Sequence, residues 1–349
     1  MKATITVVIG LLFVISFPSA AAISCKNSKG KDVDWFVGLK LPKLSDIRVP
    51  TTGYEFLYLD KKSDNWTKPE DIRAQDSAIA QTVQQLYTRT TDQLYIFYND
   101  GPPDEKLASS ARAHAKGVVY FDDDEGFWLV HSAPNFPPVK QYEYPESAAR
   151  NGQSFLCITL KSSQLRVIGT QLLYMFPSIY ESNLPNSLAS KHAELRKLFS
   201  PKELKSFVKK VGQKSTMSVK SANKMTFTSI VKSRTFKGDL YSELVTQFFK
   251  SSLYVQAWRR GSNNLASCNR KLAVKNVLEV GIGGTVFPTT KDHSKWAITV
   301  GQNRKAFICI GDINRQSSQF KRGGGTVCFE NKVVHKLFKE AVRKTEECR

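Results

Sequence analysis

The chain has 349 residues, of which 41% are hydrophobic, and it carries 51 Lys and Arg against 31 Asp and Glu. This length suffices for two domains of ordinary size or one large duplicated unit, and the globular composition excludes a low-complexity chain. The formal net charge of +20 favours polyanionic partners such as nucleic acid, or an anionic membrane surface. A charge that serves only solubility is the alternative.

The first 22 residues have the pattern of a secretory signal peptide. Lys2 provides the positive start, residues 4–17 form an apolar stretch too short to span a membrane, and residues 18–22 offer a small-residue cleavage site. We expect cleavage after about Ala22, so that the mature chain starts near Ile23. No later segment is apolar enough to cross a bilayer. The sequence therefore predicts a protein of the secretory route without a membrane anchor; an uncleaved anchor is the alternative.

The cysteines agree with an oxidising compartment. An even number of them predicts three disulfides, although six cysteines allow 15 pairings and spacing leaves the choice open. No two form a Cys-x-x-Cys pair, so a zinc site is not expected. The sequon Asn65-Trp66-Thr67 predicts a glycosylation site at Asn65. The six cysteines are Cys25, Cys157, Cys268, Cys309, Cys328 and Cys348.

Local patterns predict strands interspersed with helices. Strands are expected at 33–39, 54–59, 93–98, 118–121, 127–130, 153–160, 224–231, 254–258, 272–280, 292–300 and 306–310. Helices are expected at 70–87, 163–173, 187–199, 239–253 and 331–347. Residues 202–220 are polar and basic and show no clear pattern.

One short pattern, His-x-Lys followed by an apolar hairpin and an Asn, occurs twice. The Asn follows the His by 21 residues in both copies, and the two hairpins align without a gap at an offset of 179 residues. His and Lys two positions apart on a strand point to the same face. The members are His114, Lys116 and Asn135 in the first copy and His293, Lys295 and Asn314 in the second.

Two such pairs can meet as one site with two imidazoles and two ammonium groups. This combination suits a phosphodiester: one imidazole attacks phosphorus, the other protonates the leaving oxygen, and the lysines hold the negative oxygens. The alternative for a single histidine is a structural polar residue, but matched spacing among only five histidines favours catalysis.

Other candidates are weaker. His131 has either an orienting role or a place in the core, and His192 and His335 are expected to be solvated. The acidic run 122–125 is interpreted as a solvated turn and not as a metal site. The glycines at 323–325 lack the phosphate-loop pattern and predict a tight turn. All six cysteines are assigned to bridges, so none is a candidate nucleophile.

Several motifs spread over nearly the whole mature chain resemble the deoxyribonuclease II family, acid endonucleases of lysosomes and secretions. They are Asp34-Trp35-Phe36, Tyr98-Asn99-Asp100, His114-Ala115-Lys116-Gly117-Val118, the run from Gly126 to Pro138, Asp239-Leu240-Tyr241-Ser242, Asp292-His293-Ser294-Lys295-Trp296, Gly311-Asp312-Ile313-Asn314-Arg315 and Arg322-Gly323-Gly324-Gly325-Thr326.

This resemblance implies an α/β fold of the phospholipase D-like type: a duplicated α/β/α sandwich with two pseudo-symmetric halves, at 23–180 and 181–349, that share one active site. The wider superfamily follows His-x-Lys with an Asp, which is off register at Asp122 and missing in the second half. That absence agrees with the deoxyribonuclease II branch. The implied bridges are Cys25–Cys157, Cys268–Cys348 and Cys309–Cys328.

The resemblance also implies an endonuclease that hydrolyses DNA at acid pH, without metal or other cofactor, through a phosphohistidine to 3′-phosphate products. In this scheme His114 and His293 are nucleophile and acid in an order left open, the two lysines stabilise the phosphorane oxygens, and Asn135 and Asn314 are donors or orient the histidines. A bell-shaped rate profile with an acid optimum follows from the two imidazoles.

The expected destination is the lysosome or the exterior, and monomer and homodimer both stay open. Two alternatives also stay open: a phospholipase D-like phosphodiesterase with another substrate, and a secreted DNA-binding protein without catalysis. The basic segment 202–220 is a candidate for the DNA groove, with a plain solvated helix as the alternative.

Overall fold

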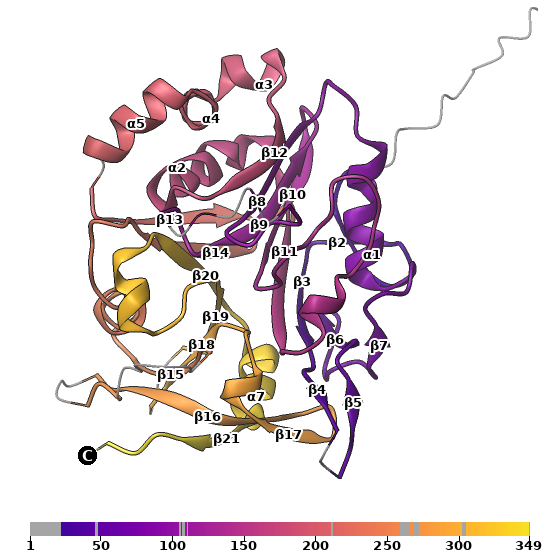
Figure 1. The fold of residues 1–349 in the computed structure, drawn as a ribbon, viewed down its shortest axis with the longest axis vertical. Coiled ribbons are helices and arrows are strands. Elements are labelled where there is room, and N and C mark those ends of the chain that lie inside the picture. Colours follow the sequence, from indigo (N-terminus) through magenta and orange to yellow (C-terminus); the bar gives the residue numbers. More distant parts are fainter. Residues whose placement is uncertain are drawn as a thin grey trace, which may run out of the picture.

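The computed structural model describes residues 22–45, 48–104, 106, 109, 111–210, 212–258, 266–268, 272–301 and 305–348. Residues 1–21 of the predicted signal peptide (1–22) and the turn residues 302–304 lie outside these ranges. The described chain is a mixed α/β protein with two large, mostly antiparallel sheets and few helices (Figure 1). No helix in the described ranges is long and apolar enough to cross a membrane.

The first sheet is built from the N-terminal part of the chain. Its eight strands are all antiparallel to their neighbours. In spatial order they are β12 (Ile179–Asn183), β8 (Leu94–Asn99), β9 (Lys116–Phe121), β10 (Glu125–His131), β11 (Gln153–Lys161), β3 (Trp35–Lys40), β6 (Glu55–Asp60) and β7 (Glu70–Asp71).

The second sheet is built from the C-terminal part. Its neighbours are antiparallel except for β15 and β16, which are parallel. The spatial order is β13 (Lys214–Lys220), β14 (Thr226–Lys232), β20 (Gly324–Glu330), β19 (Phe307–Gly311), β18 (Trp296–Val300), β15 (Ser252–Gln256), β16 (Val274–Ile282) and β17 (Thr285–Pro288), and β21 (Val342–Thr345) pairs with β16. Two small ribbons, β1 (Cys25–Lys26) with β2 (Asp32–Val33) and β4 (Lys43–Leu44) with β5 (Thr51–Thr52), pair separately from the two large sheets.

The two predicted hairpins take the same place in their sheets. β9 and β10 lie between β8 and β11, and β18 and β19 lie between β15 and β20. The strand order also matches beyond the hairpins on one side: β3 and β6 come after β11 in the first sheet, and β14 and β13 come after β20 in the second. Both His-x-Lys segments therefore enter equivalent strands.

One hydrophobic core joins the two sheets. It contains Trp35 and Trp128 from the first sheet and Trp296 and Phe329 from the second, all almost fully buried. The rings of Trp35 and Phe329 lie 5.3 Å apart across the junction. Burial of aromatic surface at this junction holds the halves in one arrangement.

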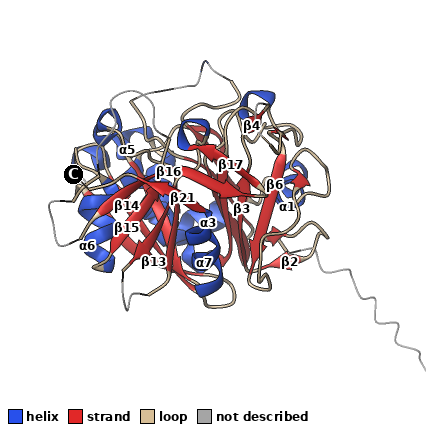
Figure 2. Cartoon of the chain, turned by 90° about the horizontal axis from the view of Figure 1, so that it is seen from below, coloured by secondary structure: helices blue, strands red, loops and turns tan. Residues whose placement is uncertain are grey.

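The helices lie around this framework (Figure 2). α1 (Ala78–Val83) packs on a second core with strands of the first sheet, whereas α2 (Leu165–Met175) and α7 (Lys332–Ala341) pack on the joint core. The remaining helices are α3 (Asn186–Lys191), α4 (Ala193–Phe199), α5 (Pro201–Lys210) and α6 (Thr246–Phe249).

Several predicted helices are shorter than expected because residues at their ends pair with strands instead. Residues 70–71 form an edge strand with β6, and Ser77 then caps α1 by accepting from the peptide N–H of Ala80 at 3.2 Å. The helix expected to run to residue 347 ends at Ala341, where β21 begins.

The other helix predictions need similar corrections. The segment 187–199 breaks at His192, and 239–253 holds a π-turn (Tyr241–Val245), α6 and the start of β15. The segment 202–220, which lacked a clear pattern, contains all but the first residue of α5 and the whole of β13.

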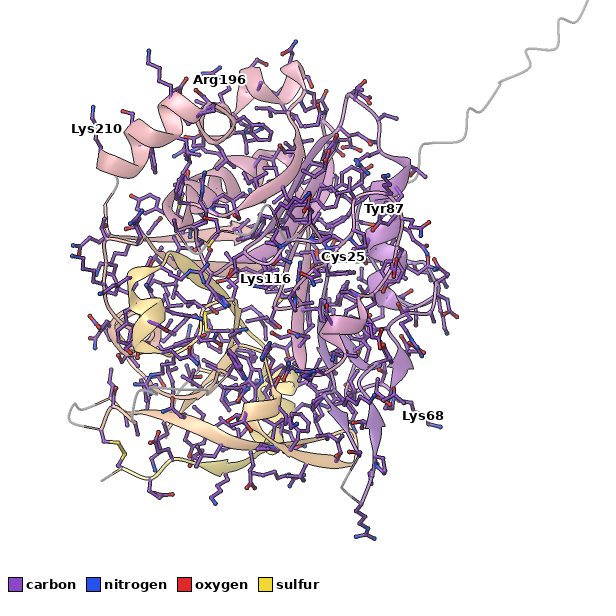
Figure 3. All side chains as sticks on the ribbon, viewed as in Figure 1. Cys25, Lys68, Tyr87, Lys116, Arg196 and Lys210 are labelled. Atoms are coloured by element: carbon purple, nitrogen blue, oxygen red, sulfur yellow. A yellow bond between two sulfur atoms is a disulfide. The ribbon has the colours of Figure 1, made fainter. Side chains whose placement is uncertain are left out.

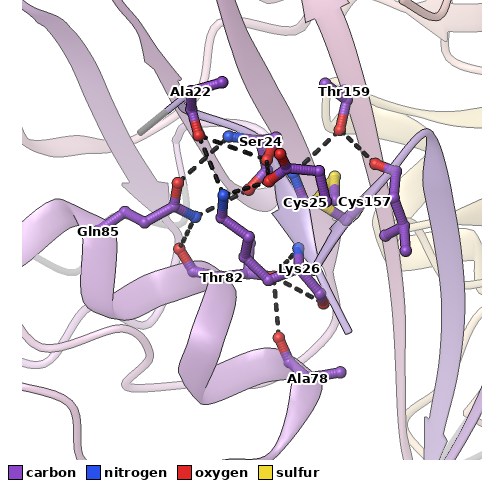
Figure 4. Close-up of a disulfide and its surroundings, with 11 residues drawn as sticks. Ala22, Ser24, Cys25, Lys26, Ala78, Thr82, Gln85, Cys157 and Thr159 are labelled. Carbon is purple, nitrogen blue, oxygen red and sulfur yellow. Dashed lines mark hydrogen bonds and ion pairs between the residues drawn. A yellow bond between two sulfur atoms is a disulfide. The ribbon is translucent and has the colours of Figure 1, made fainter. Parts of the chain in front are cut away.

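The three disulfides implied by the family resemblance are confirmed: Cys25–Cys157, Cys268–Cys348 and Cys309–Cys328. Figure 4 shows the first of them, which joins β1 to the central strand β11. Beside it, the peptide N–H of Cys25 donates to Thr159 Oγ1 at 3.0 Å and that of Lys26 donates to Thr82 Oγ1 at 2.9 Å. The N-terminal strand is thereby fixed between β11 and α1.

Candidate active site

Both His-x-Lys segments lie where their strands begin. Lys116 is the first residue of β9, and Lys295 directly precedes β18, so the histidines stand just outside the strands. Figure 3 places Lys116 near the middle of the molecule, where the two sheets meet. The prediction that the two pairs form one site agrees with their mutual electrostatic effects, because each histidine's pKa responds to the lysine of the opposite half.

Backbone hydrogen bonds cross between the halves at this point. The peptide N–H of His114 donates to the carbonyl oxygen of Gly323 at 2.9 Å, and that of His293 donates to Gly152 at 2.8 Å. Each histidine is thus fixed by a loop that belongs to the other sheet.

The imidazole of His114 has a defined tautomer. Its Nδ1 lies 2.5 Å from the carbonyl oxygen of Asp312, and since a carbonyl only accepts, Nδ1 carries the proton. Nε2 lies 3.9 Å from Asp100 Oδ2, and the side chain is 13% exposed. In the neutral ring Nε2 therefore has a free lone pair, as a nucleophile or proton acceptor requires.

Asp100 is the anionic centre of the first half. It forms ion pairs with Lys116 and with Arg322, whose Nη2 lies 3.0 Å from Oδ2. Arg322 also donates to the carbonyl oxygens of Arg112 and Ala113, at 3.1 and 3.0 Å, directly before His114. Burial alone would raise the pKa of Asp100, but His114, Lys116 and Arg322 outweigh it and hold this pKa well below its usual range.

The second half has an aromatic ring where the first has a carboxylate. Trp258 follows β15 as Asp100 follows β8, and its ring centroid lies 4.3 Å from that of His293. Lys295 donates from Nζ to the carbonyl oxygen of His293 at 2.5 Å. The two histidines therefore differ in surroundings although their backbones match.

Burial and positive charge keep both imidazoles neutral in the free site. Burial, followed by the nearby lysines, lowers the pKa of His114 to about 3 against the opposing effect of Asp100, and lowers that of His293 to about 2. Burial and Lys116 lower the pKa of Lys295 to about 7. A ligand with negative charge would offset the excess of positive charge in this site and so favour a protonated histidine.

The two asparagines hold the loops next to the histidines. Asn135, at φ +55°, donates its peptide N–H to the carbonyl oxygen of Gly101 at 2.7 Å. With its side-chain amide oriented to match its neighbours, the amide nitrogen donates to the carbonyl oxygens of Gly101 and Pro102, each at 3.1 Å. Asn314 Oδ1 accepts from the peptide N–H of Trp258 at 3.2 Å. Asn135 thus binds the residues that follow Asp100, and Asn314 binds Trp258 itself. Among the described residues, neither asparagine side chain forms a hydrogen bond with an imidazole.

The remaining histidines lie elsewhere. His131 is fully buried and stacks on Phe155, with ring centroids 5.9 Å apart, so it takes the core alternative. The prediction that His192 is solvated is wrong, because it is 8% exposed at the break between α3 and α4. His335 is half-buried and Nε2 lies 2.7 Å from the carbonyl oxygen of Thr299.

Sequence reasoning assigned no role to Asp100, Arg322 or Trp258. Asp100 and Arg322 stood within quoted family motifs, but their meeting depends on the joining of two loops distant in sequence. Among the described residues, no three His, Cys, Asp or Glu side chains gather as a metal-binding group, and the acidic run 122–125 forms a turn in which Asp124 is 82% exposed. The Asn65 side chain is exposed, and its glycosylation stays a prediction.

Two imidazoles among lysines can supply a base, an acid and cationic contacts for a phosphate ester. The sequence model described as deoxyribonuclease II matches residues 24–348, and the chain belongs to this family of deoxyribonucleases. It is 40% identical to plancitoxin-1 of Acanthaster planci, over 97% of this chain and 96% of that protein. It is 37% identical to deoxyribonuclease-2 of Caenorhabditis elegans (95% and 96%) and 35% identical to human deoxyribonuclease-2-beta (95% and 93%).

The variant Asp100→Asn should destabilise the protein by about 3–5 kcal/mol at neutral pH, because it leaves Lys116 and Arg322 buried without their anion. The folded-state pKa of Asp100 is depressed, so its contribution is present above the unfolded pKa of about 3.9 and is lost as the pH falls through the folded value. Urea unfolding at neutral pH and near pH 3 measures both effects. Asp124→Asn, on an exposed turn, is the control, and equal stabilities of the two variants at neutral pH would contradict the assignment.

Proposed function

We propose that the chain is an acid, metal-independent endonuclease that hydrolyses DNA through a phosphohistidine and leaves 3′-phosphate ends. The main support is the meeting of two His-x-Lys segments from two sheets at one buried, cationic point. The names of the relatives supply the substrate class, since several are deoxyribonucleases. The net charge of +20 suits a polyanion.

In the first step, a neutral histidine attacks phosphorus through Nε2. The bond from phosphorus to the 5′-oxygen breaks, and the other histidine, protonated, gives its proton to that oxygen. Lys116 and Lys295 stabilise the charge on the non-bridging oxygens. The charge-assisted contacts of Lys116 and Asp100 hold one of these ammonium groups in place before substrate arrives.

In the second step, the histidine that lost its proton removes one from water. The resulting hydroxide attacks phosphorus, the bond from nitrogen to phosphorus breaks, and a 3′-phosphate is released. Both histidines return to their starting protonation states. Asn135 and Asn314 act as orienting residues, because they hold the loops that carry Asp100 and Trp258.

The fold proposal is that the two sheets are the halves of a duplicated phospholipase D-like unit, at 23–180 and 181–349. The matched strand order around the hairpins and the crossed histidine contacts support it. β12 spans this boundary as the edge strand of the first sheet. The lysosome or the exterior is the proposed destination, in keeping with three disulfides.

Plasmid DNA should be cut in the presence of EDTA at about pH 5, and the variants His114→Asn and His293→Asn should each lose at least about 100-fold in kcat, since acid–base catalysis contributes about 10²–10⁴-fold. His335→Asn, on α7, is the control. Agarose gels and thermal melting measure cleavage and folding. Loss of cleavage with EDTA, or a folded histidine variant with the wild-type rate, would overturn the mechanism.

The rate should rise as the pH falls from about 8 to about 5 and decline at still lower pH. Both imidazole pKa values are lowered, so lower pH is needed to supply the protonated acid, whereas very low pH also protonates the nucleophile. Raising the pH through about 7 also removes the charge of Lys295. A profile of kcat/KM against pH measures this, and a rate that increased towards alkaline pH would count against it.

A further inference from the structure

Lys40 ends strand β3 with its ammonium group enclosed by carbonyl oxygens. The residue is 2% exposed. Its Nζ donates to the carbonyl oxygens of Ala148 at 2.8 Å, Ala149 at 3.0 Å and Asn151 at 2.5 Å. These residues form the loop that leads into β11. One side chain therefore fixes a whole turn of backbone.

Lys232 does the same at the end of strand β14. It is 1% exposed, and its Nζ donates to the carbonyl oxygens of Gln319 at 3.2 Å, Phe320 at 2.9 Å and Arg322 at 2.5 Å. Each of these acceptors lies 171 residues after its counterpart in the first loop. The second loop leads into β20, the strand that matches β11. The two lysines therefore occupy equivalent places in the two sheets.

The residue that follows each enclosed loop accepts a hydrogen bond from the peptide N–H of the proposed catalytic histidine in the other half. Gly152 comes directly after Asn151, and its carbonyl oxygen accepts the peptide N–H of His293 at 2.8 Å. Gly323 comes directly after Arg322, and its carbonyl oxygen accepts a hydrogen bond from the peptide N–H of His114 at 2.9 Å. Each lysine is thus connected, through one loop, to the histidine of the opposite half.

The loops have little room to move. A Cβ atom added at Gly152 would lie 2.4 Å from Asp292 Oδ1, and one added at Gly323 would lie 2.1 Å from the carbonyl oxygen of Met175. The backbone of each loop therefore touches the opposite half directly. A small displacement of either loop would move a histidine.

Stability alone does not account for two buried ammonium groups. Neither lysine forms an ion pair with a carboxylate in the described part of the chain, and burying a charge costs free energy that an apolar side chain would avoid. An ammonium group has three N–H donors that match three converging carbonyls, and the planar guanidinium of Arg has a different geometry. Both loops also begin with a 3-10 turn, Glu146–Ala148 and Ser317–Lys321, and the lysines reach carbonyl oxygens near and beyond the ends of these turns.

We propose that Lys40 and Lys232 are paired positioning residues, each of which fixes the catalytic histidine of the opposite half through the loop it encloses. This assignment rests on the proposed function for the role of the histidines. It extends that function by two residues that touch neither imidazole.

The protonation of these lysines agrees with work at acid pH. Burial lowers the pKa of Lys40 to about 7, against the opposing effects of Asp292 and Glu55. Burial lowers that of Lys232 to about 8, against Asp239 and Glu243. Below these values each ammonium keeps three donors for three carbonyls. Above them a neutral amine has only two N–H donors for the three carbonyls.

Selective ¹⁵N-histidine labelling tests the crossed connection directly, because the sequence has only five histidines. In Lys40→Met the amide resonance of His293 should shift and that of His114 should stay in place, and in Lys232→Met the reverse should hold. Assignment comes from the His→Asn variants. Equal shifts of both histidines in each variant, or no shift in either, would overturn the proposal. Lys40→Gln and Lys232→Gln, which keep neutral donors, replace a Met variant that fails to fold.

The same variants should lose about 100-fold in kcat, as expected for a displaced catalytic group, with KM changed less than about threefold. Lys161→Met is the matched control, since Lys161 ends the neighbouring strand β11 with its side chain 50% exposed. Full kcat in folded Lys40 and Lys232 variants would contradict the assignment. The amide shifts require no DNA, so failure of wild-type cleavage in EDTA would refute the proposed function while leaving the crossed positioning intact.

Discussion

The candidate site depends on one exchange between the two sheets: each histidine of the His-x-Lys pairs donates its peptide N–H to a glycine carbonyl of the other sheet. The histidines precede their strands, so the strands alone do not fix them. The opposite loop supplies the missing restraint, and glycine is required there because any side chain would meet the facing backbone or carboxylate. The joint core of Trp35, Trp128 and Phe329 keeps this exchange in register. Packing at the junction therefore holds the candidate site together, as well as the fold.

A second consequence is electrostatic. Bringing the halves together buries several cations near two imidazoles, and the buried anion Asp100 pairs with Lys116 and Arg322. What remains is a neutral pair of histidines with positive neighbours, which is a site short of negative charge. A phosphodiester supplies that charge, so binding and protonation of a histidine become coupled. This coupling is the physical reason to expect that the proposed activity requires acid pH.

The sequence predicted the parts of the site that are repeated locally and missed the parts created by tertiary contact. The spacing of His, Lys and Asn was visible in both halves, and the apolar runs around it predicted both hairpins. Helix ends at residues 70–87 and 331–347 were wrong because edge strands form there, and strand pairing with distant residues leaves no local signal. Asp100 and Trp258 occupy matching places with unlike chemistry, so no repeat revealed them. In the sequence, Lys40 and Lys232 have in common only their place at the end of a predicted strand. That feature is too frequent to predict their contacts with distant loops.

The central claim is that a histidine bonds covalently to phosphorus in a site formed by both halves. Its most direct test is the stereochemistry at phosphorus, with DNA that carries one phosphorothioate of known configuration and is cleaved in ¹⁸O-water with EDTA present. Two in-line displacements, first by histidine and then by water, predict retention of configuration in the 3′-phosphorothioate product. Inversion would show a single direct attack by water and would contradict the account.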